Sequence, residues 1–220
     1  MSPAREVVVV DYGRGNLFSV CQAVSRVGGS PRLTSDPEVV AGASRLILPG
    51  VGAFGDAMGG LRGLGLDQAV KTFAAGGRPL LGICLGMELL LEESSEFGRH
   101  EGLGLIPGRV DRLPEPAAGS REKIPNVGWC PLAEAEHGPV WKESIFNGVR
   151  VGDFVYFVHS YAAYPADPRD RLADIVFAGT AVTAAVARGN VSGCQFHPEK
   201  SGEVGLAILS SFVNDAPERR

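Results

Sequence analysis

The chain has 220 residues, of which 45% are hydrophobic, and its formal net charge is −4. One sizeable core fits this length, so we expect a single domain over residues 1–220. The 21 Lys and Arg residues are scattered and form no basic stripe, which argues against a nucleic-acid partner. The apolar run over residues 7–10 is too short for a signal-peptide core, and Glu88 interrupts the longest apolar stretch. We therefore expect a cytoplasmic protein with no membrane partner.

The first third of the chain predicts strands and helices in alternation. This rhythm is typical of a doubly wound, mostly parallel α/β sheet of the flavodoxin-like type, whose ligands bind beyond the carboxyl ends of the strands. The predicted strands are residues 7–11, 45–48 and 80–83, and the predicted helices are residues 17–27, 56–61 and 65–73.

The second half has a different pattern. Residues 105–158 contain glycines, prolines and short strand-like pieces, which indicate a smaller antiparallel portion. Strands return at residues 172–177, 182–187 and 191–195, and a last helix is predicted over residues 203–213.

The sequence around Cys84 predicts a nucleophile elbow. A short apolar strand runs into Gly82-Ile-Cys-Leu-Gly86 and then into a helical pattern. Small residues on both sides of Cys84 allow the sharp, strained turn that exposes the side chain above the sheet edge. At the amino end of a helix, N–H groups and the dipole are expected to favour the attacking thiolate. The Leu85 N–H is expected to donate to a developing oxyanion.

The other cysteines predict no further site. Cys21, Cys130 and Cys194 are interpreted as small core residues, because no Cys-x-x-Cys spacing suggests a zinc site or a disulfide framework. We therefore expect no metal.

Residues 195–199, Gln-Phe-His-Pro-Glu, place an imidazole and a carboxylate two positions apart. In an extended segment these side chains point the same way, so Glu199 can orient His197 while His197 reaches the Cys84 sulfur. His159 has two interpretations: a second base or a hydrogen-bonded structural residue, of which we favour the second.

Two glycine-rich segments follow predicted strands. Residues 48–54, Leu-Pro-Gly-Val-Gly-Ala-Phe, close a strand at the edge where Cys84 is expected, and their free peptide planes can turn an N–H toward an oxyanion. An ordinary glycine-rich turn is the alternative. Residues 13–18 fit a dinucleotide-binding motif poorly, because Phe18 stands where the third glycine belongs.

Together these motifs resemble the triad class, or class I, of glutamine amidotransferases, in which Gly-x-Cys-x-Gly and a late His-x-Glu release ammonia from glutamine. Further segments narrow the resemblance to the glutaminase subunits of imidazole glycerol phosphate synthase. The resemblance extends from about residue 7 to residue 212 and implies the class I amidotransferase fold. The segments that carry it are residues 10–17, 48–54, 123–129, 157–161 and 196–201.

The resemblance implies a mechanism without metal or organic cofactor. Cys84 would attack the side-chain amide of glutamine, His197 would pass a proton to the leaving ammonia, and water would hydrolyse the glutamyl thioester. An adjustable oxyanion segment would be formed by Gly50, Val51 and Gly52, while Ser160 and Tyr161 would lie near the amino-acid end of the substrate.

The resemblance also implies a partner. In relatives, ammonia passes within a heterodimer to a (β/α)₈-barrel cyclase subunit, which makes imidazole glycerol phosphate and AICAR for histidine biosynthesis. The residues implied to lie toward this interface are Asn16, Trp129, Tyr156 and Lys200.

Three positions depart from the family pattern. Glu88 stands where relatives usually carry glutamine, one helical turn beyond Cys84, and we expect its carboxylate to pair with the ammonium of the substrate. Asn126 and Cys130 replace a common histidine and asparagine. Three other functions stay open: an amidotransferase subunit for pyridoxal phosphate or purine synthesis, a redox-sensing cysteine protein on the same fold, and an inactive partner-binding subunit.

Overall fold

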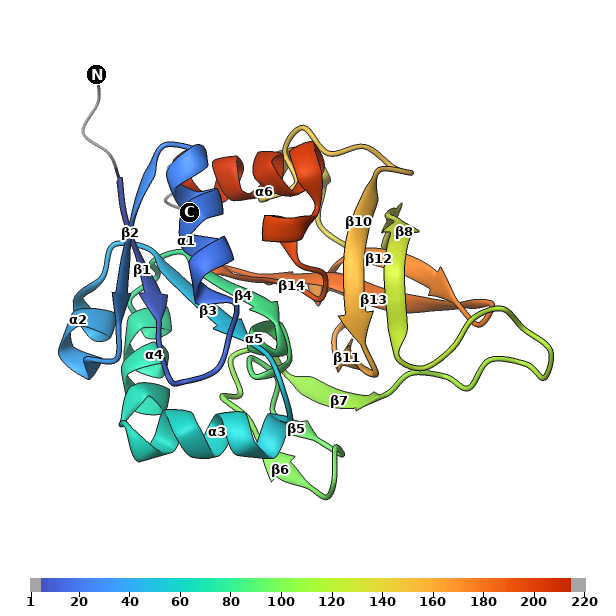
Figure 1. The fold of residues 1–220 in the computed structure, drawn as a ribbon, viewed down its shortest axis with the longest axis horizontal. Coiled ribbons are helices and arrows are strands. Elements are labelled where there is room, and N and C mark those ends of the chain that lie inside the picture. The colour runs from blue at the N-terminus through green and yellow to red at the C-terminus, as the bar shows by residue number, and fades with distance from the viewer. Residues whose placement is uncertain (1–4, 215–220) are drawn as a thin grey trace.

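The structure is a computed structural model and describes residues 5–214. Across this range the main sheet has eight strands, of which the first five in spatial order are mutually parallel and the remaining three are antiparallel (Figure 1). In spatial order the strands are β2 (Gly29–Thr34), β1 (Arg5–Val10), β3 (Leu46–Gly50), β4 (Leu80–Cys84), β14 (Val191–Cys194), β13 (Thr180–Arg188), β12 (Arg171–Phe177) and β9 (Ala133–Glu134).

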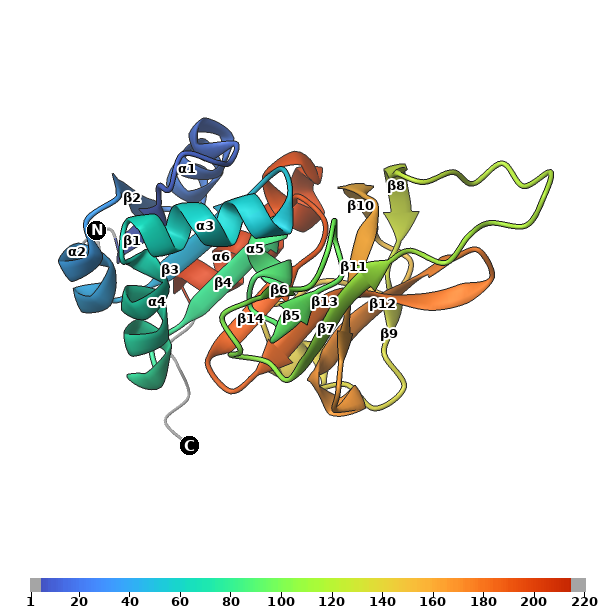
Figure 2. The same cartoon turned by 90° about the horizontal axis from the view of Figure 1, so that it is seen from below.

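Two smaller sheets follow in the described residues: the first is antiparallel, as predicted, whereas the second is mixed and contains one parallel pair of strands. One pairs β10 (Phe154–His159) with β8 (Asn126–Pro131), and the other has the order β11-β7-β5-β6. The loop that joins β7 to β8 projects away from the rest of the molecule (Figure 2). The strands of the second sheet are β11 (Tyr161–Pro165), β7 (Gly108–Arg112), β5 (Glu93–Ser94) and β6 (His100–Glu101).

Helices cover both faces of the parallel strands (Figure 1). One face carries α1 (Leu17–Arg26) and α6 (Gly202–Asn214), and the opposite face carries α2 (Pro37–Gly42), α3 (Phe54–Gly63) and α4 (Leu66–Ala75). A short helix, α5 (Leu85–Glu88), follows β4 directly. Three 3₁₀ turns complete the regular structure: η1 (Trp141–Glu143), η2 (Pro168–Asp170) and η3 (Pro198–Lys200).

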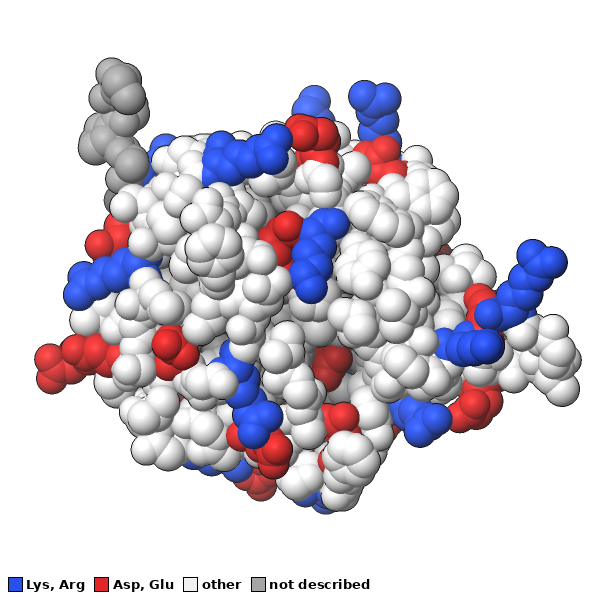
Figure 3. Space-filling view, in the orientation of Figure 1, with Lys and Arg blue, Asp and Glu red and all other residues white. Residues whose placement is uncertain are grey.

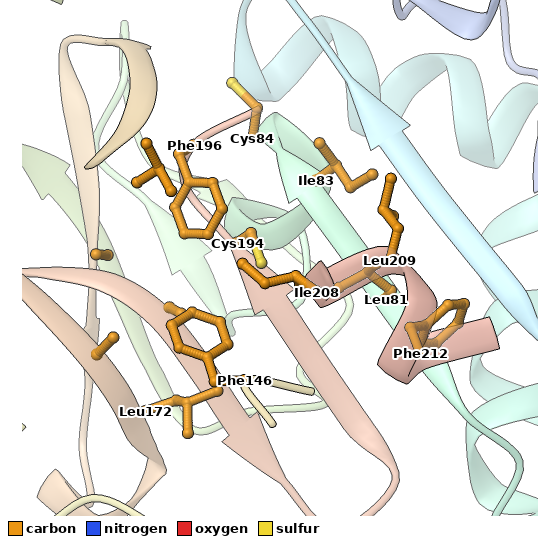
Figure 4. Packing of buried hydrophobic residues seen from close by; sticks show 14 of the residues in the cluster. Leu81, Ile83, Cys84, Phe146, Leu172, Cys194, Phe196, Ile208, Leu209 and Phe212 are labelled. Atoms are coloured by element: carbon orange, nitrogen blue, oxygen red, sulfur yellow. The ribbon is translucent and has the colours of Figure 1, made fainter. Parts of the chain in front are cut away.

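The valines of β1 show why this sheet is buried on both sides. Val7 and Val9 pack into the cluster that includes α1 and α6, whereas Val8 and Val10 pack into the cluster beneath α2, α3 and α4. All four are fully buried, and each such side chain contributes about 1.5–3 kcal/mol by leaving water. Figure 4 shows the first cluster, where Leu209 of α6 lies near Leu81 and Ile83 of β4. The site's strands are thus held rigidly from both faces.

The predicted fold class is confirmed, with three differences of detail. Strand β2 was not predicted, because it lies at the sheet edge, contains Pro31 and is mostly exposed, so it has no apolar run. Helix α2 was also missed, although Asp36 caps its amino end in the usual way. The helix after Cys84 ends already at Glu88. Within residues 5–214, no helix is long and apolar enough to cross a membrane.

Candidate active site

Cys84 adopts the strained elbow that the sequence predicts. Its φ of 55° and ψ of −117° fall in a region that residues other than glycine rarely occupy. The flanking glycines are needed for steric reasons: a Cβ on Gly86 would collide with the Leu48 carbonyl oxygen, and one on Gly82 would lie 2.7 Å from the Gly86 oxygen. The elbow therefore packs tightly against β3.

The expectation that the helix end favours a thiolate is wrong for this structure. Burial raises the pKa of the Cys84 thiol well above its ordinary value, and Glu88, when ionised, raises it further. A hydrogen bond from the Leu85 N–H lowers the pKa but does not outweigh burial. The physical reason is that α5 has only four residues and supplies little dipole. The resting group is a neutral thiol.

His197 and Glu199 form the predicted pair. The His197 Nδ1 lies 2.8 Å from the Glu199 Oε1, and the two side chains are only 4% and 1% exposed. The basis for the prediction was wrong, because β14 ends at Cys194 and Glu199 belongs to the 3₁₀ turn η3 instead of an extended segment. Pro198 begins that turn, and the turn brings the carboxylate back toward the imidazole.

The outer nitrogen of His197 is available for proton transfer. Nε2 is buried and has no hydrogen-bond partner within residues 5–214. Two hydrogen bonds hold the backbone of His197. Its N–H donates to the Tyr156 carbonyl oxygen, and its carbonyl oxygen accepts from the Ser201 hydroxyl. A fixed imidazole with one free ring nitrogen is what a general acid–base group requires.

The sheet brings Cys84 and His197 to one edge. Strands β4 and β14 are parallel neighbours, with Cys194 in register with Ile83, so both residues follow the carboxyl ends of adjacent strands. Figure 4 shows Cys84 above the end of β4 next to Phe196, the neighbour of His197. The charge of Glu199 raises the pKa of Cys84 and that of Lys200 lowers it, as expected for groups at one edge.

The predicted oxyanion segment lies beside the elbow. Gly50, at the end of β3, is the register partner of Cys84. A Cβ on Gly50 would lie 2.9 Å from the Gly86 nitrogen and 3.0 Å from the Leu85 Cβ. Val51 is 40% exposed, and Gly52 has a φ of +98°, a conformation that favours glycine. Leu85 directs its N–H toward the Cys84 sulfur.

Glu88 is a buried acid at the rim of this site. Its Oε1 accepts a hydrogen bond of 2.8 Å from the Gln195 Nε2. Burial raises the pKa of Glu88 to about 8, the hydrogen bond from Gln195 lowers it, and the charge of Glu96 raises it. The Gln195 Oε1 is buried without a hydrogen-bond partner in the described part of the chain. At neutral pH, Glu88 is therefore mostly protonated.

Sequence reasoning missed two residues near the site. Gln195 is fully buried and donates a hydrogen bond to Glu88. Its position on a predicted strand, two residues before His197, could have indicated that it lies near the site. Glu96 accepts a hydrogen bond of 2.6 Å from the Phe54 N–H and so holds the start of α3, directly after the oxyanion segment. Its segment follows α5 without any periodic pattern, and no local signal pointed to it.

The segment that contains His159, Ser160 and Tyr161 joins β10 to β11. His159 is buried, with its Nδ1 2.8 Å from the Tyr161 oxygen and its Nε2 3.0 Å from the Asn126 Nδ2. Burial lowers the pKa of His159 to about 4, which confirms the structural interpretation. Ser160 is half-buried, and Tyr161 packs against the cluster that contains Leu85.

Two of the four predicted interface residues lie on an apolar surface. Trp129 and Tyr156 are register partners on β8 and β10, with ring centroids 5.9 Å apart, and Trp129 is 53% exposed. Asn16 precedes α1, and Lys200 is exposed at the end of η3. The outward face of the β8–β10 sheet is largely uncharged (Figure 3). The exposed apolar side chains on it are Val127, Trp129, Phe154 and Val158.

Other parts of the described chain offer no competing centre. In residues 5–214, no group of three His, Cys, Asp or Glu side chains could hold a metal ion. An open surface pocket lined by Glu92, Arg99 and Arg109 contains none of the predicted site residues.

The structure combines a parallel sheet, a cysteine elbow, a buried His–Glu pair just beyond the neighbouring strand and a glycine-rich segment beside the cysteine. This is the arrangement of an acyl-transfer enzyme with a thiol nucleophile. Residues 8–216 match the family Glutamine amidotransferase class-I, and the chain belongs to this family.

Its relatives in sequence have consistent names. The chain is 48% identical over 208 residues to "Imidazole glycerol phosphate synthase subunit HisH 1" of Legionella pneumophila (strain Lens), which covers 94% of this chain and 98% of that protein. The HisH subunit of Aromatoleum aromaticum is 44% identical, and the match covers 96% of this chain and 99% of that protein. Among solved structures, "Structure of PurLQS from Thermotoga maritima" has a TM-score of 0.72 at 20% identity, covering 96% of this chain and 99% of that chain. The last likeness shows the fold alone.

Proposed function

We propose that this chain is the glutaminase subunit of imidazole glycerol phosphate synthase and hydrolyses glutamine to glutamate and ammonia. The main support is the 44–48% identity, over nearly the whole length, to proteins named as HisH subunits of that enzyme. The cysteine elbow beside a buried His–Glu pair supports the chemistry. The likeness to the PurLQS structure, at 20% identity, gives no separate support to a purine role. This biosynthetic role fits a cytoplasmic enzyme.

The first half-reaction forms a thioester. The neutral thiol of Cys84 gives its proton to the free Nε2 of His197, and the sulfur attacks the amide carbon of glutamine. The N–H groups of residues 50–52 and of Leu85 stabilise the resulting oxyanion. His197, held by Glu199, then gives the proton to the leaving nitrogen, so that the C–N bond breaks and ammonia departs.

The second half-reaction releases glutamate. His197 removes a proton from water, the hydroxide attacks the thioester carbon, and the C–S bond breaks. The proton returns to the Cys84 sulfur, which restores the neutral thiol. Because the carboxylate of Glu199 is buried against the imidazole, it stabilises the imidazolium present in both halves.

Glu88, Ser160 and Tyr161 would bind the amino-acid end of glutamine. Glu88 is buried at the elbow, and an ammonium group placed beside it would lower its raised pKa and create a charge-assisted pair. Tyr161 begins β11 (Tyr161–Pro165), and this strand contacts α5, the helix that follows Cys84. This arrangement would select an α-amino acid over a simple amide.

The partner would be the (β/α)₈-barrel cyclase subunit, bound as a heterodimer. The exposed apolar face with Trp129 and Tyr156 has the aromatic composition that protein interfaces favour. Asn16 and Lys200 would extend the interface beyond this face. Free ammonia would mostly be protonated in neutral water and lose its nucleophilicity, so a sealed interface would favour its transfer to the acceptor. The cyclase would use the ammonia to form imidazole glycerol phosphate and AICAR.

The test is glutamate formation from glutamine by the full chain, alone and with the cyclase subunit and its nucleotide ligand. We expect strong stimulation by the liganded partner and complete loss of activity in Cys84→Ala. Cys21→Ala is the matched control. Cys21 is half-buried on α1, so this variant should retain activity. Glutamate formation that the cyclase leaves unchanged would favour a different acceptor. No activity under any condition would favour a sensor or scaffold.

A further inference from the structure

Tyr12 connects the first strand of the sheet to the oxyanion segment. It lies just beyond the carboxyl end of β1, is 5% exposed, and belongs to the residue 10–17 motif, which the mechanism above leaves without a role. Its hydroxyl donates a hydrogen bond of 2.9 Å to the carbonyl oxygen of Pro49. Because β1 and β3 are parallel neighbours, this bond bridges two strand ends at the edge where Cys84 lies.

The bond restricts the peptide that begins the oxyanion segment. The Pro49 carbonyl and the Gly50 N–H belong to one planar peptide and point in opposite directions, so holding the oxygen sets the direction of the N–H. Gly50 itself is confined from both sides: a Cβ there would lie 2.6 Å from the Tyr12 hydroxyl and 2.9 Å from the Gly86 nitrogen. No other residue fits between Tyr12 and the elbow.

Beyond Gly50 the confinement ends. Val51 is 40% exposed, and Gly52 adopts a φ of +98° in an exposed position. The segment thus has a fixed start beside Cys84 and an exposed continuation at Val51 and Gly52.

The hydroxyl of Tyr12 is also chemically suited to act as a permanent donor. Burial raises its pKa far above the ordinary value for tyrosine, and Cys84 raises that pKa further whenever its thiol is ionised. The group therefore stays protonated throughout the working pH range. The same effect places Tyr12 within electrostatic range of the predicted nucleophile.

We propose that Tyr12 is a positioning residue for glutamine hydrolysis: its hydroxyl anchors the Pro49–Gly50 peptide beside Cys84, so that only the peptides after Gly50 reorient to complete the oxyanion site. This inference rests on the proposed glutaminase function. It assigns Tyr12 no contact with substrate.

The test is Tyr12→Phe, which keeps the ring and removes only the hydroxyl. We expect kcat for glutamine hydrolysis, measured with the cyclase subunit, to fall about tenfold while KM stays within twofold, because a misaligned oxyanion donor acts on the transition state. Alkylation of Cys84 by iodoacetamide, which needs no oxyanion site, should keep its wild-type rate. Tyr164→Phe, a half-buried tyrosine on β11, is the matched control and should change neither value.

A second measurement does not depend on activity. Amide hydrogen exchange over residues 50–53 should become at least threefold faster in Tyr12→Phe than in the wild type. Wild-type kcat or unchanged exchange would overturn the inference. So would equal losses of kcat and of alkylation rate with a lowered melting temperature, because these indicate general damage. If the wild type forms no glutamate, the proposed function fails. The hydrogen-exchange comparison then still tests whether Tyr12 anchors the Pro49–Gly50 peptide.

Discussion

Gly50 is the register partner of Cys84 across the parallel strands β3 and β4. Adjacent strands lie about 4.8 Å apart, so the first residue of the oxyanion segment is separated from the elbow by one strand spacing. Both residues end their strands, so the elbow and the oxyanion segment begin at the same edge of the sheet. The site is therefore assembled by strand register, and its proposed chemistry leads to five predictions.

Glu199→Gln should lower kcat for glutamine hydrolysis by at least about 100-fold, with little change in KM. The amide keeps the size of the side chain but loses the charge that holds the His197 Nδ1 and stabilises the imidazolium. Steady-state kinetics with the cyclase subunit measure the effect. Glu203→Gln, on the exposed surface of α6, is the matched control and should behave as wild type. A kcat within threefold of wild type would show that Glu199 has no such role.

Glu88→Gln should raise KM for glutamine about tenfold, because it removes the charge proposed to pair with the substrate ammonium. The pH dependence separates this effect from a simple loss of packing. The wild-type kcat/KM should rise as Glu88 ionises around its pKa of about 8, and the variant should lose that rise. Identical KM values and pH profiles would remove Glu88 from the binding site.

The same residue has a consequence for stability. The pKa of Glu88 is about 8 in the folded chain and 4.5 for an exposed glutamate, so between these values the folded state binds more protons than the unfolded state. Stability is then lost as the pH rises from about 4.5 to about 8. The melting temperature of Glu88→Gln relative to wild type should therefore be higher at pH 8.5 than at pH 5. A difference that does not change with pH would contradict the buried, protonated acid.

Gly52→Ala should destabilise the chain by about 1–2 kcal/mol and lower kcat at least tenfold. The φ of +98° is strained for any residue with a Cβ, so the oxyanion segment would have to change its course. Gly59→Ala is the matched control, because Gly59 lies in α3 with open space around it. That replacement should leave activity intact and stabilise slightly. Thermal unfolding and glutaminase kinetics test both variants. Equal effects of Gly52→Ala and Gly59→Ala would contradict a special requirement for glycine at position 52.

Trp129→Ala should weaken binding of the cyclase subunit at least tenfold. An exposed tryptophan that packs edge-on against Tyr156 can anchor a partner, and its removal leaves a gap in the centre of the apolar β8–β10 face. Titration calorimetry measures the Kd. Val176→Ala, an exposed apolar residue on β12, is the control and should bind as wild type. Equal affinities for wild type and Trp129→Ala would place the interface elsewhere.

The amino-acid sequence alone determined the local features of the site. Apolar runs and flanking glycines define β1, β3, β4 and the Cys84 elbow, because burial and backbone sterics act over a few neighbouring residues. Motif resemblance supplied the family, which the match over residues 8–216 confirms. Strand β2 escaped prediction, since an exposed edge strand has no such local signal.

Only the tertiary structure decided which groups meet and in what state. The hydrogen bond from Gln195 to Glu88, the contact of Tyr12 with Pro49, and the burial that keeps Cys84 a neutral thiol join residues from different strands. Hydrogen-bond partners and desolvation depend on how the sheet and helices pack. The periodicity of a sequence does not predict which residues more than 30 positions apart will be in contact. The sequence therefore specified the reacting groups, and packing specified their protonation and alignment.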